Sequence, residues 1–224
     1  MTLATRDTLD RRPIASRELA VFQRLASRLA RSGISPNAIS ASSIVFGAGA
    51  GAALAATSFT AGGWSRALWL GAAALVQLRL IANLLDGMVA VEARKRSPLG
   101  ELFNEAPDRI SDASILVGAG YAAGSDPVLG YLAALLAVLV AYLRALGATA
   151  GAGQVFAGPM AKPQRMFVVT LTALWSGLAP AAWQPALDGR SLMTLALVVI
   201  GAGSAVTLFR RWRRIVSSLR SREA

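Results

Sequence analysis

The chain has 224 residues, a net formal charge of +11, 54% hydrophobic residues and a mean hydropathy of +0.51. It contains neither cysteine nor histidine, which excludes disulfides, thiolate nucleophiles, Ser-His-Asp triads and zinc sites built on thiolate or imidazole. A bound metal would therefore be held by oxygen, as Mg²⁺, Mn²⁺ and Ca²⁺ are, and a general base would be a carboxylate.

The first 35 residues are polar and rich in arginine, and they contain no visible cleavable signal peptide. Within them, residues 16–31 predict an amphipathic helix, because apolar residues recur at helical spacing and arginines fill the other face. Gly33 and Pro36 are expected to end it. The helix either lies in the membrane interface or forms a solvated cap on the rest of the protein. The apolar positions are Leu19, Phe22, Leu25, Ala26 and Leu29.

Apolar blocks of about 18–20 residues follow, a length typical of transmembrane helices. We expect an all-α integral membrane protein with six spans and the amphipathic helix before them. The spans are predicted at residues 41–60, 67–86, 104–124, 128–146, 166–183 and 192–208. The chain then divides into an N-terminal segment at 1–35, a six-span domain at 36–209 and a basic tail at 210–224.

Positive charge is distributed unevenly among the loops. Lysine and arginine gather before the first span, between spans 2 and 3, between spans 4 and 5, and after span 6. The three remaining loops hold only Arg66 and Arg190. By the positive-inside rule both termini are cytosolic, and a bacterial inner membrane is the expected location. Contact with anionic lipid accounts for the charge, and no nucleic-acid partner is expected.

Charged residues in spans 2 and 3 indicate a site, since each costs about 2.5–3.5 kcal/mol inside a membrane helix. Residues three or four apart share a helix face, and two facing helices with oxygen ligands can hold a hard cation. The alternative is buried ion pairing of Asp108 or Asp112 with Arg79 or Arg144. The two sets that share a face are Asn83, Asp86, Gly87 and Ala90, and Gly100, Asn104, Asp108 and Asp112.

This pattern resembles the motif of the CDP-alcohol phosphatidyltransferases, D-x-x-D-G-x-x-A-R, eight residues, then G-x-x-x-D-x-x-x-D. The chain has N-L-L-D-G-M-V-A-V from Asn83, then eight residues, then G-E-L-F-N-E-A-P-D from Gly100. Every spacing is kept. The S-P-N-A-I-S run before the first span and the six-span plan are also similar to the family, so the resemblance covers most of the chain.

The resemblance implies transfer of a phosphatidyl group from a CDP-alcohol, usually CDP-diacylglycerol, to an alcohol acceptor in phospholipid biosynthesis, with release of CMP. It also implies one or two Mg²⁺ or Mn²⁺ ions, a lipid environment and a homodimer. Asp108 is the expected base and, with Asp86, an expected metal ligand. The residues expected to line the nucleotide and diphosphate site are Asn37, Gly87, Ala90, Arg94 and Gly100.

Three positions depart from the family pattern. Asn83 and Asn104 stand where it has aspartate, and Val91 stands where it has arginine. Asparagine can still ligate through its carbonyl oxygen but lacks the charge. Glu105 and Asp112 are nearby carboxylates expected to compensate. Glu105 faces the site only if Pro107 distorts the first turns of its helix.

An acceptor pocket is expected beside the site, and several converging cations would suit a phosphorylated alcohol. Alternatively, these cations anchor cytosolic helix ends. The two asparagines also keep open a second function, a catalytically degenerate family member acting as a membrane binding or scaffold protein. Transport is a weaker third possibility, because paired discontinuous repeats are not evident. The candidate acceptor residues are Arg79, Arg109, Arg144, Lys162 and Arg165.

Overall fold

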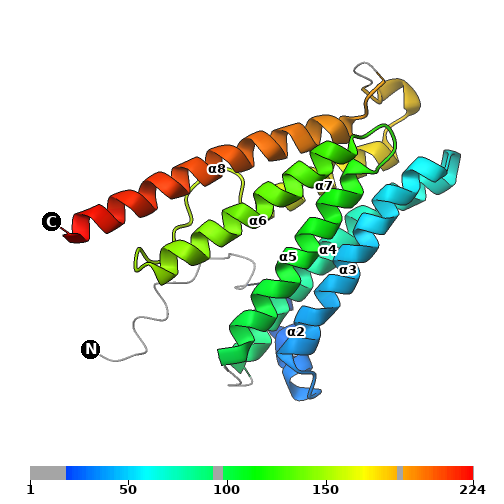
Figure 1. Ribbon diagram of the computed structural model, residues 1–224. Coiled ribbons are helices and arrows are strands. Elements are labelled where there is room, and N and C mark those ends of the chain that lie inside the picture. Colours follow the sequence, from blue (N-terminus) through cyan, green and yellow to red (C-terminus); the bar gives the residue numbers. More distant parts are fainter. Residues whose placement is uncertain (1–18, 93–97, 186–188, 224) are drawn as a thin grey trace.

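The computed structural model describes residues 19–92, 98–185 and 189–223 (Figure 1). These residues form seven α-helices and two short 3₁₀ helices, η2 at Thr57–Phe59 and η3 at Ala181–Trp183. The α-helices are α2 at Ala20–Arg31, α3 at Pro36–Ala56, α4 at Gly62–Glu92, α5 at Pro98–Gly120, α6 at Pro127–Thr149, α7 at Lys162–Leu178 and α8 at Leu192–Glu223.

Local sequence explains where several helices begin and end. The Ser35 side chain accepts a hydrogen bond from the Ala38 amide and Pro36 occupies the first turn of α3, an arrangement that favours a helix start. Asp126 caps α6 in the same way, accepting from the Val128 amide at 2.9 Å. Gly33 has a φ of 80°, which glycine adopts without steric cost, and it separates α2 from α3.

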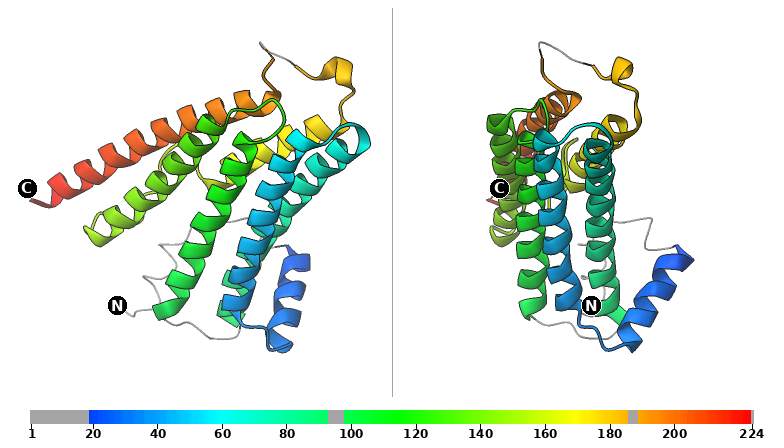
Figure 2. Two further views of the ribbon diagram at one scale, coloured as in Figure 1. Left: turned by 45° about the vertical axis from the view of Figure 1, so that its right-hand side comes forward. Right: turned by 90° about the vertical axis from the view of Figure 1, so that its right-hand side faces the viewer.

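The helices pack as a bundle in which α3 lies against both α4 and α5, α4 contacts α7, and α6 lies between α5 and α8. Figure 2 shows α6 and α8 running side by side and diverging from α3, α4 and α5 toward the end where α2 lies. Glycines allow the closest approach of α3 and α5. A Cβ on Gly118 would overlap the carbonyl oxygen of Gly51.

The surface and the interior have the polarity of a membrane protein. Large apolar side chains such as Leu132, Phe167 and Leu171 are exposed on the outside of the bundle, whereas Arg79 and Asp112 are buried within it. Within the described ranges, four helices are long and apolar enough to cross a membrane. These candidate spans are Pro36–Phe59, Gly62–Val91, Pro127–Thr149 and Leu192–Ser221.

The predicted all-helical membrane class is therefore confirmed, but the count of six spans is not. α7 has only 17 residues, and α5 carries several charged side chains in its first half, so neither meets the same criterion of length and composition. The predicted amphipathic helix is present as α2, with Arg28 and Arg31 in its last turn. α8 continues to Glu223, well beyond the predicted end of the sixth span at residue 208.

Candidate functional site

Five helices supply the side chains of one polar cluster. α4 and α5 carry the acidic and amide residues predicted from the motif, α3 supplies Ser40, and α7 supplies Lys162 and Arg165. α6 adds Arg144, which reaches Glu105 on α5. The helical periodicity of α4 and α5 thus brings groups distant in sequence to a single place within the bundle.

Asp86 is buried, with 3% of its surface exposed, and both of its carboxylate oxygens have donors. The Ser40 hydroxyl donates to Oδ2 at 2.6 Å, and the Gly87 amide donates to Oδ1 at 2.5 Å. Ser40 was not among the predicted site residues. The only sequence signal for it was its place in the S-P-N-A-I-S run, since no local pattern indicates which α4 side chain it contacts.

The two carboxylate oxygens of Asp108 contact cations from two different helices, α4 and α7. Arg79 Nη2 lies 3.2 Å from Oδ1, and Lys162 Nζ lies 2.5 Å from Oδ2. The same lysine nitrogen donates to the Asn83 side-chain oxygen at 2.6 Å. One ammonium group from α7 therefore connects the first motif residue on α4 with the last motif residue on α5.

Asp112 lies one turn further along α5 and pairs with two arginines. Arg79 Nη2 is 2.7 Å from Oδ1, and Arg165 Nη2 donates to Oδ2 at 3.0 Å. Arg165 also donates to the Met160 carbonyl at 3.1 Å. All three charged side chains are almost fully buried. Buried ion pairing with Arg79 is the alternative that the sequence left open for Asp108 and Asp112, and the structure shows it for both.

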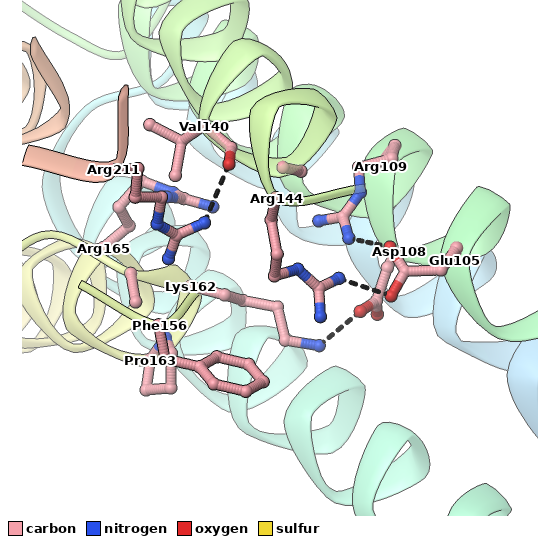
Figure 3. Close-up of a pocket in the computed structure, with 12 residues that line it drawn as sticks. Glu105, Asp108, Arg109, Val140, Arg144, Phe156, Lys162, Pro163, Arg165 and Arg211 are labelled. Atoms are coloured by element: carbon pink, nitrogen blue, oxygen red, sulfur yellow. Dashed lines mark hydrogen bonds and ion pairs between the residues drawn. The ribbon is translucent and has the colours of Figure 1, made fainter. Parts of the chain in front are cut away.

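A cavity of about 200 Å³ opens beside Asp108 (Figure 3). Glu105 lies on its wall and pairs with Arg109 and with Arg144, whose Nη2 is 2.6 Å away. Arg144 also stacks over Phe156, 5.8 Å from the ring centroid. Glu105 was expected to face the site only if Pro107 distorts the helix. α5 continues as a helix through Pro107, and Glu105 lines the cavity.

The cavity lining is strongly cationic. Two carboxylates, Glu105 and Asp108, face five positively charged side chains. Four of these were predicted for the acceptor pocket, and Arg211 was not. Arg211 is buried and donates to the carbonyls of Val140 at 2.8 Å and Ala157 at 3.0 Å. The five cations are Arg109, Arg144, Lys162, Arg165 and Arg211.

The remaining predicted residues are less completely placed. Asn37 lies in the first turn of α3, and Gly87 and Ala90 lie on α4 beside Asp86. Gly100 and Asn104 belong to α5, but the surroundings of Gly100 and the side chain of Asn104 fall outside the described part of the structure, as does the whole of Arg94. Their predicted roles in metal and diphosphate binding stay predictions.

The donor chemistry fits one hard cation. Asp86 and Asp108 supply two carboxylates, and Asn83 supplies a carbonyl oxygen, the ligand types that Mg²⁺ and Mn²⁺ prefer. Lys162 contacts both Asn83 and Asp108 in this structure, so an ion ligated by these two residues would have to displace the lysine ammonium. Within residues 19–92, 98–185 and 189–223, no three acidic side chains gather into a metal-binding group. Glu105 and Asp112 instead contact arginines, so these contacts do not support their predicted role as compensating ligands.

Comparison with known proteins agrees with the helical membrane fold. No model of a known protein family matches the sequence. The chain is 29% identical over 116 residues to the inner membrane protein YnbA of Escherichia coli K12, an alignment that covers 52% of this chain and 56% of YnbA. The chain therefore matches only about half the length of this curated relative.

Solved structures of Mycobacterium tuberculosis phosphatidylinositol phosphate synthase, PgsA1, have a similar fold. The form with CDP-DAG bound has a TM-score of 0.69 at 17% identity, over 88% of this chain and 94% of that chain. The complex with manganese and citrate has a TM-score of 0.69 at 16% identity, over 87% and 88%. At these identities the likeness establishes the fold, not the activity.

Proposed function

We propose that this protein transfers a substituted phosphate group from a CDP-alcohol to an alcohol acceptor and releases CMP. The observation that carries the proposal is the position of Asp108. The Lys162 ammonium bridges its carboxylate to the Asn83 side chain on α4, and Asp108 also lines a cationic cavity. The motif spacing and the PgsA1 fold support the same activity. CDP-diacylglycerol is the proposed donor, because it is the ligand in the PgsA1 structure.

Asp108 would act as the general base. Its Oδ2 lies on the cavity side, where an acceptor hydroxyl can approach, and a carboxylate in hydrogen-bond reach can take the hydroxyl proton. The acceptor oxygen then forms a bond to the β-phosphorus, while the bond from that phosphorus to the CMP oxygen breaks. Arg79 holds the other carboxylate oxygen and thereby fixes the orientation of the base.

Asp86 and Asp108, with the carbonyl oxygen of Asn83, would hold a Mg²⁺ or Mn²⁺ ion. A bound divalent cation supplies charge neutralisation for the diphosphate and for the departing CMP. Crystallisation of PgsA1 with manganese supports this class of ion. Ser40 and the Gly87 amide orient Asp86 for that role, as outer hydrogen bonds commonly orient metal ligands.

The acceptor would bind in the cavity, and its cationic lining favours an alcohol that carries a phosphate group. Guanidinium groups bind phosphate oxygens in pairs, and within the described residues Arg109 and Arg144 share a single carboxylate, that of Glu105. The buried position of Arg211 gives this wall a rigid support. The five cations that line the cavity exceed its two carboxylates by three charges, and a phosphate group on the acceptor would offset part of that excess.

We also propose that the protein has six spans and forms a homodimer in a bacterial inner membrane. Its site would lie on the cytosolic side. If α5 and α7 also cross the bilayer, packed between the four long apolar helices, the span count becomes six and, as with any even number, both termini share one side. Arg24, Arg28 and Arg31 on α2 and the arginines at the end of α8 support a cytosolic assignment for that side.

The test is incubation of the purified protein with radiolabelled CDP-diacylglycerol, Mn²⁺ and a panel of alcohols with and without phosphate. We expect CMP release and a labelled lipid product with a phosphorylated acceptor. If no alcohol gives CMP, the degenerate binding protein is the better assignment. The variant Asn83→Asp with Asn104→Asp then tests that alternative, because a gain of CMP release would indicate a site that had lost two ligands.

A further inference from the structure

The amphipathic helix α2 carries a groove lined by arginines. Arg24, Arg28 and Arg31 are spaced four and three residues apart, so they share one face of the helix, and all three are exposed. They line a groove of about 330 Å³ together with uncharged residues of the same helix, among them Gln23 and Ser27. In the part of the chain that the structure describes, every charged side chain on this groove is therefore positive.

No acidic side chain of the described residues pairs with these arginines. α2 contains no aspartate or glutamate, and the sequence has none from Ala20 to Leu85. The ion pairs between described residues all lie elsewhere in the bundle. Arg31 Nε donates to the Ser27 carbonyl at 3.2 Å, a contact that orients the guanidinium but does not neutralise it. The groove thus presents positive charge that an anionic partner would offset.

The opposite face of α2 holds the helix against the bundle. This face consists of Phe22, Ala26 and Leu29. These residues belong to one hydrophobic cluster with Leu85 and Val89 of α4, and Figure 2 shows α2 beside α4 at one end of the molecule. Because this packed face is apolar and the arginines occupy the other side of the helix, the groove faces away from the helices on which α2 packs.

A strip of exposed apolar side chains runs beside the arginines. Val21 and Leu25 are 70% and 37% exposed, and each precedes an arginine of the groove by three residues, so the two strips are neighbours on the helix surface. Four residues after α2 the candidate membrane span Pro36–Phe59 begins. A soluble anion would match the arginines only. A phospholipid matches both strips, with its phosphate and with its acyl chains.

We propose that α2 is a docking surface for anionic phospholipid. Headgroup phosphates bind in the groove of Arg24, Arg28 and Arg31, since guanidinium groups match phosphate oxygens, and the acyl chains contact Val21 and Leu25. A lipid with net negative charge is preferred over a zwitterionic lipid, by about fivefold for each arginine near the headgroups. The surface is separate from the cavity beside Asp108, so it does not depend on the proposed transferase activity.

Fluorescence quenching on the full-length protein tests this surface. The chain has no cysteine, so Val21→Cys creates a unique site for a nitrobenzoxadiazole label on the apolar strip. The labelled protein, in neutral detergent, is titrated with phosphatidylglycerol that carries a nitroxide near the start of one acyl chain, or with the matching phosphatidylcholine. We expect half-maximal quenching by phosphatidylglycerol at a concentration at least about tenfold lower. Added salt should reduce this difference, because it screens exposed charges.

Replacing all three groove arginines with glutamine should bring the two lipids to nearly equal quenching concentrations. The matched control replaces three exposed arginines of α8, Arg210, Arg214 and Arg220, with glutamine, and it should keep the preference for phosphatidylglycerol. Circular dichroism verifies that each variant is folded. If the groove variant does not fold, the salt titration of the labelled parent still decides the question, because it needs no change in the groove.

Three results would overturn the inference. Equal quenching of the labelled parent by the two lipids would mean that the arginines do not select anionic lipid. An equal loss of preference in both triple variants would indicate a general charge effect. Recovery of fluorescence on addition of millimolar inorganic phosphate would indicate a site for a soluble anion in place of a lipid surface. CMP release takes no part in the measurement, so failure of the proposed function leaves the result interpretable.

Discussion

Asp112 Oδ1 lies 2.7 Å from Arg79 Nη2, and both side chains are enclosed by the bundle. Because Arg165 contacts the other oxygen of the same carboxylate, one aspartate compensates two arginines from α4 and α7. Arg79 in turn contacts Asp108. Asp112 therefore helps to position Asp108 through the Arg79 guanidinium. It also stabilises the packing of α4, α5 and α7.

Replacing Asp112 with asparagine should destabilise the protein severely. The buried Arg165 guanidinium would lose the carboxylate with which it pairs, and Arg79 would lose the nearer of its two carboxylates. Removing one partner of a buried pair costs roughly 3–5 kcal/mol. We expect a large fall in the midpoint of thermal unfolding in detergent. The control is Glu105→Gln, which also removes a carboxylate from two arginines, but at a position where the Glu105 side chain is 41% exposed and the loss should be about 1 kcal/mol or less. Equal effects of the two variants would contradict a structural role specific to Asp112.

Ser40→Ala should weaken metal and donor binding without unfolding the protein. The change removes the hydroxyl that donates to Asp86 Oδ2 at 2.6 Å, and loss of such orienting bonds typically costs about 10–100-fold in metal affinity. The measurement is a Mn²⁺ titration of CMP release. Ser42→Ala is the control, because the Ser42 hydroxyl donates to the Ile39 carbonyl of its own helix and not to Asp86. A Ser40→Ala protein with the parent's Mn²⁺ dependence would remove Ser40 from the site.

Helical spacing predicted that Asn83 on α4 and Asp108 on α5 face one another, and Lys162 contacts both side chains, whereas the side chain of Asn104 lies outside the described part of the structure. Arg79, predicted as an acceptor residue and, alternatively, as an ion-pair partner of Asp108 or Asp112, contacts Asp108 in the structure. Ser40 and Arg211 were missed for a physical reason. Each acts across helices, and an arginine near a helix end has the same sequence pattern whether it contacts lipid or, like Arg211, donates to buried carbonyls.

The number of spans shows the same limit of sequence patterns. α5 was predicted as a span although Asp108, Arg109 and Asp112 lie in its first half. Composition alone cannot distinguish a charged helix shielded by its neighbours from one at a membrane surface. The contacts of α5 with α3 and α6 and the ion pairs of Asp112 provide the shielding, and these are properties of the tertiary structure.

Gly118→Ala should reduce stability because α3 and α5 touch through their backbones at this point. A Cβ on Gly118 would overlap the Gly51 carbonyl and Cα, so the helices would have to separate, at a cost of about 1–3 kcal/mol or more. Thermal unfolding in detergent measures the effect. Gly71→Ala on α4 is the control, since no atom lies within 4 Å of its added Cβ and alanine favours a helix by about 1 kcal/mol. An unchanged midpoint for Gly118→Ala would show that the two helices are not in such close contact.

Asp108→Asn should abolish CMP release while the protein remains folded in the membrane. A neutral amide cannot accept the proton of the acceptor hydroxyl, and loss of a general base costs about 10²–10⁴-fold in rate. Asparagine keeps the shape and one carbonyl oxygen, so either Arg79 or Lys162 can retain a hydrogen bond. Asp108 is also a proposed metal ligand, so the rate should be measured at saturating Mn²⁺, where a weakened ion site is refilled. If saturating Mn²⁺ restores turnover, Asp108 acts as a ligand and another group takes the proton. If the rate stays low while the unfolding midpoint stays near that of the parent, Asp108 is the general base. Asp112→Asn is expected to lower the unfolding midpoint instead, so the two variants distinguish a catalytic aspartate from a structural one.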